Sequence, residues 1–135
     1  MPLTAADREF LDQPGYMRLA TLMPDGAPQN TVLWYRLAGE TLNVICPQSA
    51  QKVRNLERDG RVAAIVEDPA SAHRYLELRG ICRVVRDDAY ARRELAEIAR
   101  RYIGDRAGEF VAGLSADPRV VLQLTPEQVR RYGVS

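Results

Sequence analysis

The chain has 135 residues, 46% of them hydrophobic, and its 19 basic and 18 acidic side chains leave a formal charge of +1. This length predicts one domain (residues 1–135) with a sizeable core, and the near balance of scattered charges argues against general affinity for nucleic acid. No apolar run is long enough to span a membrane and no signal peptide is recognisable, so we expect a cytoplasmic protein. Cys46, Cys82 and a single histidine without metal-ligand spacing predict neither a disulfide nor a metal site.

The hydrophobic pattern changes from a period of 3.6 to a period of 2 after the first dozen residues, which predicts a mainly β protein. Helices are expected at 4–11, 50–58, 88–103 and 108–114, with a last helical turn opening at 125–127. Strands are expected at 16–23, 28–37, 41–46, 61–67, 73–86 and 119–124. Tight turns join the first three strands into an antiparallel meander.

Gly80 interrupts the side-chain pattern of the longest predicted strand, which indicates a bulge or a sharp bend. Six strands with such a bend predict a small antiparallel β-barrel, closed or half-open, with flanking helices. Side chains fill the interior of so small a barrel, so a sizeable ligand must bind outside it or at an edge. We therefore expect a homodimer with ligands in the groove between its subunits.

The predicted helix 50–58 begins with positively charged side chains, although the dipole of a helix favours negative ones at its N-terminus. Lys52, the only lysine of the chain, falls in its first turn and Arg54 follows, whereas the first acid, Glu57, comes late. Each positively charged side chain at a helix N-terminus destabilises the helix by about 0.3–1 kcal/mol when no negative charge lies beside it. With Ser49 as the expected N-cap, this segment predicts a bound anion, most simply a phosphate. The alternative to a bound anion is a short helix whose charged side chains are exposed to solvent.

A second interpretation of this segment is acyl transfer, because Ser49 and Lys52 have the Ser-x-x-Lys spacing of penicillin-recognising acylases. The chain has neither the Ser-Asp-Asn nor the Lys-Thr-Gly motif of those enzymes and is too short for their fold. Acyl transfer is therefore set aside.

The order of these segments resembles the pyridoxamine 5'-phosphate oxidase-like family, whose members are FMN-binding, Greek-key split β-barrels. The resemblance rests on the strands at 18–22 and 30–35, the turn at 24–28, the helix at 49–56 and the segments at 61–63 and 75–80, and it covers roughly residues 11–124. It extends to the small branch that uses the deazaflavin coenzyme F420. It implies a split barrel and a homodimer with FMN or F420 at the subunit interface.

The resemblance also implies roles for particular residues. The cofactor phosphate would be bound by Ser49, Lys52, Arg54 and Asn55, and the cofactor ring would lie along Asn30, Thr31, Val32 and Trp34. Gln48 matches a cofactor-binding position in the loop between strand and helix. Arg74, Arg79 and Arg83 are candidates for the anionic tail of F420. A lone tryptophan such as Trp34 is also typical of core or interface packing, and His73 is expected in a solvated loop. Nothing near the C-terminus matches the substrate-phosphate residues of pyridoxamine phosphate oxidase itself, so that activity is not expected.

The function implied is an F420-dependent reductase that transfers hydride to a planar conjugated small molecule, such as a biliverdin-like tetrapyrrole or a quinone-like compound. The catalytic residues are unknown, because the chemistry would belong to the cofactor. Two alternatives stay open: an FMN-dependent oxidoreductase of the same fold, and a flavin-, deazaflavin- or tetrapyrrole-binding protein without turnover. RNA binding is disfavoured, because Trp34 and Tyr35 are expected on opposite faces of one strand.

Overall fold

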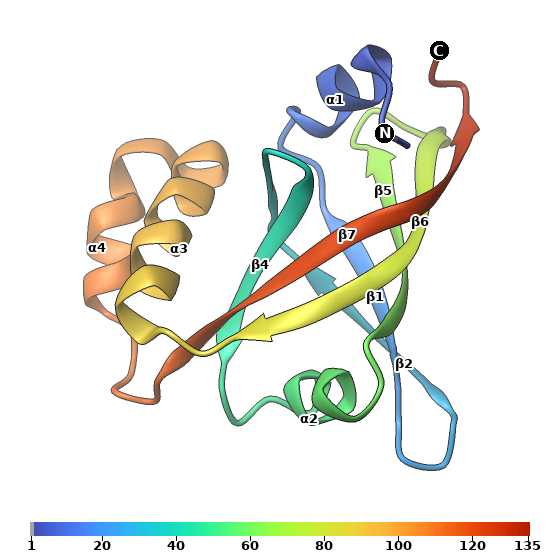
Figure 1. Cartoon of the computed structure of the whole chain (residues 1–135). Coiled ribbons are helices and arrows are strands. Elements are labelled where there is room, and N and C mark those ends of the chain that lie inside the picture. Colours follow the sequence, from blue (N-terminus) through green and yellow to red (C-terminus); the bar gives the residue numbers. More distant parts are fainter. Residues whose placement is uncertain (1) are drawn as a thin grey trace.

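The computed structural model describes residues 2–135, which form one antiparallel sheet rolled into a barrel that does not close, with helices around it (Figure 1). The sheet has seven strands in the order β2-β1-β5-β6-β7-β4-β3. The strands are β1 (Met17–Leu22), β2 (Pro28–Leu33), β3 (Arg36–Ala38), β4 (Thr41–Pro47), β5 (Arg61–Asp68), β6 (Ser71–Val85) and β7 (Arg119–Tyr132). The helices are α1 (Ala5–Leu11), α2 (Gln51–Arg58), α3 (Asp88–Ile103) and α4 (Ala107–Ala112), with a 3₁₀ turn at Gly104–Arg106. No helix in this part of the chain is both long and apolar enough to cross a membrane.

The expected split barrel is confirmed, with seven strands instead of six. The predicted strand 28–37 breaks at Trp34 and Tyr35 into β2 and β3, which are the two outer strands of the sheet although they follow one another in the chain. The Tyr35 side chain is fully buried, and its hydroxyl donates to the Leu11 carbonyl at 2.8 Å. The two residues at the break therefore connect the edges of the sheet and anchor that connection in the core.

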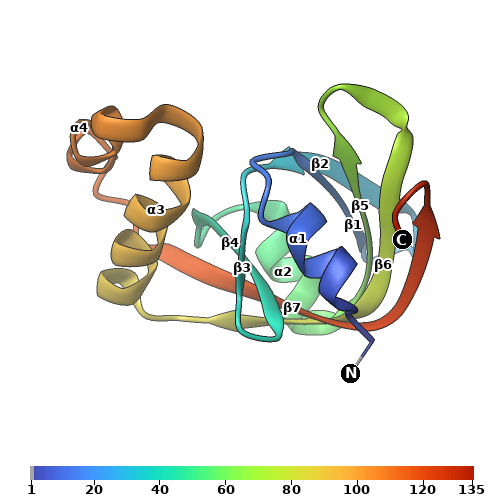
Figure 2. The same cartoon turned by 90° about the horizontal axis from the view of Figure 1, so that it is seen from above.

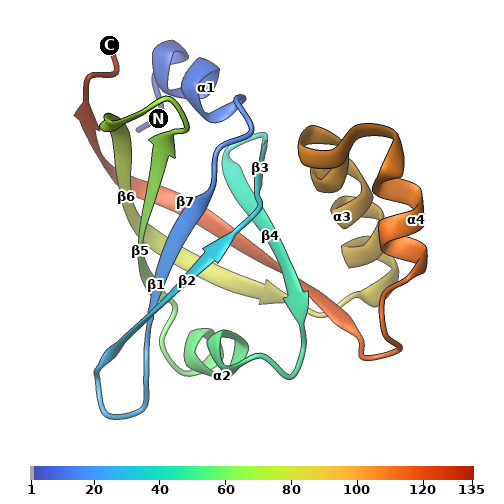
Figure 3. The ribbon, with the colours of Figure 1, turned by 180° about the vertical axis from the view of Figure 1, so that it is seen from behind.

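The helices occupy different sides of the barrel. α1 covers one end and α2 the opposite end, whereas α3 packs beside β4 and β7, and α4 packs on α3 (Figures 1 and 2). Seen from behind, α2 lies next to the hairpin formed by β1 and β2 (Figure 3). Hydrophobic side chains such as Leu19, Leu42, Leu78 and Leu124 form the core of the molecule, so any ligand is expected outside it.

Gly80 marks the bend that the sequence indicates. The register between β6 and β7 shifts between Arg79 and Gly80, and a Cβ atom built at Gly80 would lie 2.0 Å from the Thr125 carbonyl oxygen. The predicted helical turn at 125–127 was wrong, because β7 continues through it to Tyr132. Pro126 pairs with Gly80 at this irregularity. A proline, which has no N–H to donate, is tolerated in a strand at such a bulge.

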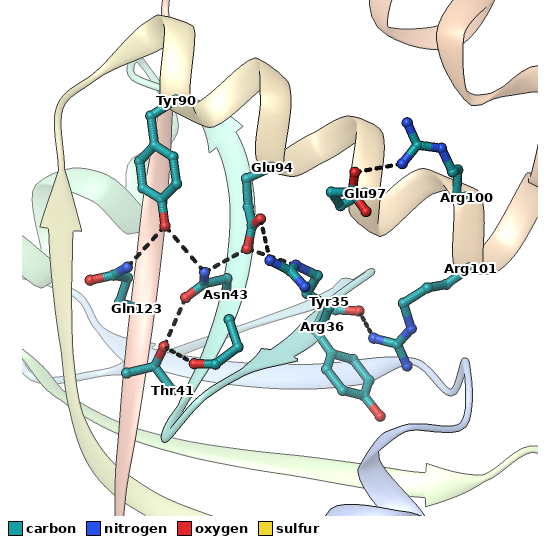
Figure 4. A network of polar contacts seen from close by, with 11 residues as sticks. Tyr35, Arg36, Thr41, Asn43, Tyr90, Glu94, Glu97, Arg100, Arg101 and Gln123 are labelled. Carbon is teal, nitrogen blue, oxygen red and sulfur yellow. Dashed lines mark hydrogen bonds and ion pairs between the residues drawn. The ribbon is translucent and has the colours of Figure 1, made fainter.

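A buried polar network attaches α3 to the outer face of the sheet (Figure 4). Glu94 on α3 is almost fully buried and accepts hydrogen bonds from Asn43 Nδ2 at 2.6 Å and from Arg36 Nε at 3.0 Å. The Tyr90 hydroxyl accepts from Gln123 Nε2 at 3.3 Å. Because each buried polar group has a partner, the network fixes the position of α3 along β3, β4 and β7.

We expect Asp7→Asn to lower the free energy of unfolding at pH 7 by about 1.5–3 kcal/mol, as for a lost hydrogen bond to a charged group. Asp7 is fully buried, caps α1 through Thr4 and pairs with Arg131 at 2.6 Å. Burial opposes ionisation, but hydrogen bonds from Arg131 and Thr4 outweigh it and hold the pKa of Asp7 below its ordinary value of 3.8.

This stabilisation should be complete above pH 3.8 and should disappear as the pH falls through the lower pKa of the folded state. Urea unfolding of both proteins between pH 7 and pH 2.5 measures it. A difference between the two proteins that stays constant down to pH 2.5 would contradict the pairing.

Candidate functional site

The start of α2 differs from the predicted one in its cap. Ala50, not Ser49, is the N-cap residue, and no side chain accepts a hydrogen bond from the first turn. The Ser49 hydroxyl donates instead to Asp117 Oδ2 at 2.8 Å, in the loop before β7. The capping role of Ser49 was therefore wrong, and the first N–H groups of α2 lack an intramolecular side-chain acceptor.

The cations of α2 have no acidic partners. Eleven arginines in residues 2–135 form ion pairs with carboxylates, but Lys52, Arg54 and Arg58 of this helix form none. Arg54 Nη1 donates to the Ser49 carbonyl at 2.9 Å, so its guanidinium group folds back over the helix start. Positive side chains without an acidic partner thus lie at the N-terminus of α2, where the helix dipole is also positive.

Asn55 has a different position from the one expected for a phosphate ligand. Its side chain is fully buried, and Nδ2 donates to Thr21 Oγ1 at 3.0 Å and to Gln29 Oε1 at 3.1 Å. These hydrogen bonds attach α2 to β1 and β2, so the Asn55 amide holds the helix against the sheet. Gln48 is exposed beside the helix start, and its backbone N–H donates to the Pro118 carbonyl at 2.8 Å.

Next to this helix start lies an apolar cleft of about 400 Å³. It runs between the edge strand β2, the end of β4 and the helices α3 and α4. Its lining residues are Val32, Leu33, Trp34, Ile45, Cys46, Pro47, Leu95, Ile98, Phe110, Leu114 and Arg119. Of the predicted ring-binding residues, Val32 and Trp34 line this cleft, and Asn30 and Thr31 lie on the same strand outside its lining.

Aromatic side chains form one wall of the cleft. Trp34 stacks on Tyr102 of α3 with ring centroids 4.9 Å apart and an angle of 4° between the planes, and Phe110 of α4 lies 5.4 Å from Trp34. The Tyr102 hydroxyl donates to the Gly15 carbonyl at 2.6 Å. Trp34 is therefore packed against a neighbouring ring, as one of the two interpretations of a lone tryptophan expects, and it also lines the cleft.

Arg119 lines the cleft, and a second cation, Lys52, is close enough to influence the thiol of Cys46 in that lining. Burial raises the pKa of the Cys46 thiol to about 11, although the positive charges of Lys52 and Arg119 act to lower it. Lys52 and Arg119 therefore both lie near the end of β4, and the thiol stays protonated at neutral pH. Arg119 was not predicted from the sequence, because only the pairing of Pro47 with Arg119 in the sheet brings it to this place.

The arginines proposed for an anionic tail do not meet the cleft within one chain. Arg79 is exposed on the outward face of β6, 3.5 Å from Glu77, Arg83 donates to Gln123, and Arg74 pairs with Asp68. His73 lies near the start of β6, in agreement with the strand expected from residue 73 and not with a loop, and its side chain is exposed to solvent.

Comparisons with known proteins identify the fold. The family model for pyridoxamine 5'-phosphate oxidase matches residues 3–133. Among solved structures, an F420 reductase is 32% identical, with 91% of this chain and 94% of that chain covered and a TM-score of 0.74. A conserved hypothetical protein from Mycobacterium tuberculosis is 25% identical (96% and 84% covered, TM-score 0.81). HutZ, a haem storage protein from Vibrio cholerae, is 24% identical (100% and 98% covered, TM-score 0.74), which concerns the fold alone. No curated protein matches. The chain belongs to the pyridoxamine 5'-phosphate oxidase family.

Proposed function

We propose that this protein is a homodimeric oxidoreductase that binds coenzyme F420 and reduces a planar conjugated small molecule. The observation that carries the proposal is that Lys52 and Arg54 form no ion pair at the uncapped start of α2, which follows the Cys46 and Pro47 end of an apolar cleft. F420 and FMN both combine a phosphate with a planar ring. The donors at the helix start suit the phosphate, and the apolar wall suits the ring.

The residues of the chain would act by binding and positioning. Lys52, Arg54 and the first N–H groups of α2 would bind the phosphate, and Val32 and Trp34 would orient the ring and keep water away from it. When bound, the coenzyme supplies the hydride. A dedicated nucleophile is not required for such chemistry.

The outward face of the sheet supports a dimer. Val32 is 57% exposed, Ile65 36% and Ile81 44%, and the small side chain of Ala63 lies between them on the same face. Arg18 lies between Val32 and Ile65 in the pairing of β2, β1 and β5, so a second copy covering this face would bury charged as well as apolar side chains and complete the groove beside β2. Arg79 lies on this face too, so it would reach a cofactor only in such a dimer.

Among the alternatives, FMN would use the same phosphate site. The 32% identity to an F420 reductase supports the deazaflavin. A haem-binding role has less support, because the single histidine of the sequence, His73, lies on β6, which contributes no residue to the cleft lining. The buried thiol of Cys46 is then the one candidate iron ligand in that lining.

Fluorescence titration with oxidised F420 and with FMN tests the assignment. We expect F420 to bind at least about tenfold more tightly than FMN, a difference that one additional charge-assisted bond supplies. Reduced F420 should then be oxidised only when a biliverdin-like or quinone acceptor is added. Absence of binding by either cofactor would refute the proposal. Binding without oxidation in the presence of any acceptor would favour a storage role.

A further inference from the structure

Arg119 is an exception among the buried charges. In residues 2–135 the buried charged side chains are Asp7, Glu94 and Arg119. Asp7 and Glu94 each pair with an arginine, at 2.6 and 2.9 Å. Arg119 is 8% exposed and has no carboxylate within ion-pair distance in the same part of the chain. Buried charges are rarely left without a counter-charge, so this arginine needs a partner from elsewhere.

The local contacts use only part of the guanidinium group. Nη1 donates to the Asp117 carbonyl and, at 3.4 Å, to Ser115 Oγ. Nε and Nη2 have no acceptor among the described residues, yet no fully buried side-chain atom there is left without a hydrogen bond, so these nitrogens keep contact with solvent. Asp88 accepts from the backbone N–H of Arg119 at 2.7 Å, but its carboxylate is held by Arg92 at 3.0 Å.

The solvent beside Arg119 is that of the cleft, since Arg119 is the one charged residue in its lining. The remaining walls are apolar, with Leu95 and Ile98 from α3 and Phe110 and Leu114 from α4. A charge pair formed in such surroundings is poorly screened and correspondingly strong. The cleft thus combines a large apolar surface with one free pair of parallel N–H donors.

We propose that the α3 and α4 side of this cleft, opposite the Val32 and Trp34 wall assigned above to the cofactor ring, binds an aromatic, apolar molecule with one anionic group, a carboxylate, held by Nε and Nη2 of Arg119. A planar carboxylate suits the fork of an arginine in the bidentate arrangement. Assigning this molecule as the substrate rests on the proposed function, in which Lys52 and Arg54 take the cofactor phosphate. The substrate class is then a conjugated carboxylic acid and not a neutral quinone.

A pair of fluorescent probes tests the site on the full chain without cofactor. 8-Anilinonaphthalene-1-sulfonate carries an anionic group on an aromatic body, and N-phenyl-1-naphthylamine is the same body without it. We expect the wild type to bind the sulfonate at least about tenfold more tightly, the effect of one charge-assisted bond. Arg119→Gln should remove this preference and leave the neutral probe unchanged. Arg119→Lys should keep part of it, and Arg93→Gln, on the exposed side of α3, should keep all of it.

Equal affinity of the wild type for the two probes would overturn the proposal even if no variant folds. It would also fail if Arg119→Gln still prefers the sulfonate, or if that variant weakens F420 tenfold and leaves the sulfonate unaffected, since Arg119 would then serve the cofactor. Lys52→Ala separates the two proposals, because it should weaken F420 without changing sulfonate binding. If the wild type binds no F420 but shows the sulfonate preference, the proposed function fails and the anion site remains.

Discussion

Gly80→Val is expected to lower the free energy of unfolding by about 3 kcal/mol or more, at the upper end of what overpacking costs. A Cβ atom at this position would lie 2.0 Å from the Thr125 carbonyl oxygen, and the atom it meets belongs to the backbone of β7. Neither strand can move away easily, because β6 and β7 are neighbouring interior strands of the sheet and are paired along their length. Urea and thermal unfolding measure the loss.

Gly108→Ala is the matched control. Gly108 lies inside α4, and a Cβ atom there would meet nothing within 4 Å. Because alanine is the better helix former, we expect a gain of about 0.5–1 kcal/mol at this site. A Gly80→Val protein that unfolds like the wild type would mean that β6 and β7 are not joined at this bulge.

Lys52→Ala is expected to weaken F420 binding by about 1.5–3 kcal/mol, roughly 10- to 150-fold, as for a lost charge-assisted hydrogen bond. The fold should be unaffected, because Lys52 has no hydrogen bond or ion pair to other side chains in residues 2–135. Fluorescence titration gives the dissociation constant, and the salt dependence of binding should fall with it.

Arg58→Gln is the control for net charge. It removes one positive charge from the same helix, but at its C-terminal end, where the Arg58 side chain donates to the Leu22 carbonyl. F420 affinity should change by less than about twofold, because the effect of a charge on a helix end falls off within one turn. Equal losses in both variants would indicate a general electrostatic effect and not a phosphate site at Lys52.

Sequence periodicity predicted the elements whose structure is decided locally. The helix at 88–103 has the bounds expected, and Gly80 was recognised because a glycine inside a strand usually marks a bulge or a close approach of another backbone. The turn predicted at 125–127 has the residues of a helix start, Thr-Pro-Glu. Pairing with β6 overrides that local preference, and nothing within the segment reveals this.

The candidate site was predictable only on its β2 and α2 side. Lys52 and Arg54 stand out by their charge, but Ser49 is bound by Asp117, 68 residues later in the chain, and Asn55 is used to hold α2 in place. The opposite wall of the cleft comes from α3 and α4, whose apolar residues follow an ordinary helical pattern. In the sequence, Arg119 is simply the first residue of a predicted strand. Its burial without a counter-charge is a tertiary property that no local pattern contains.

The dipeptide between β2 and β3 determines how the cleft can adapt to its contents. The Tyr35 ring is fixed inside the core, its hydroxyl is held by the Leu11 carbonyl, and the Arg101 guanidinium lies 4.9 Å above the ring. The two outer strands of the sheet therefore form a rigid wall of the cleft. On the other side of the cleft, α4 packs mainly on α3 and on the turn Gly104–Arg106, whereas α3 also packs on β4 and β7. We therefore expect a bulkier ligand to be accommodated on the side of α4 and not on the side of β2 and β3.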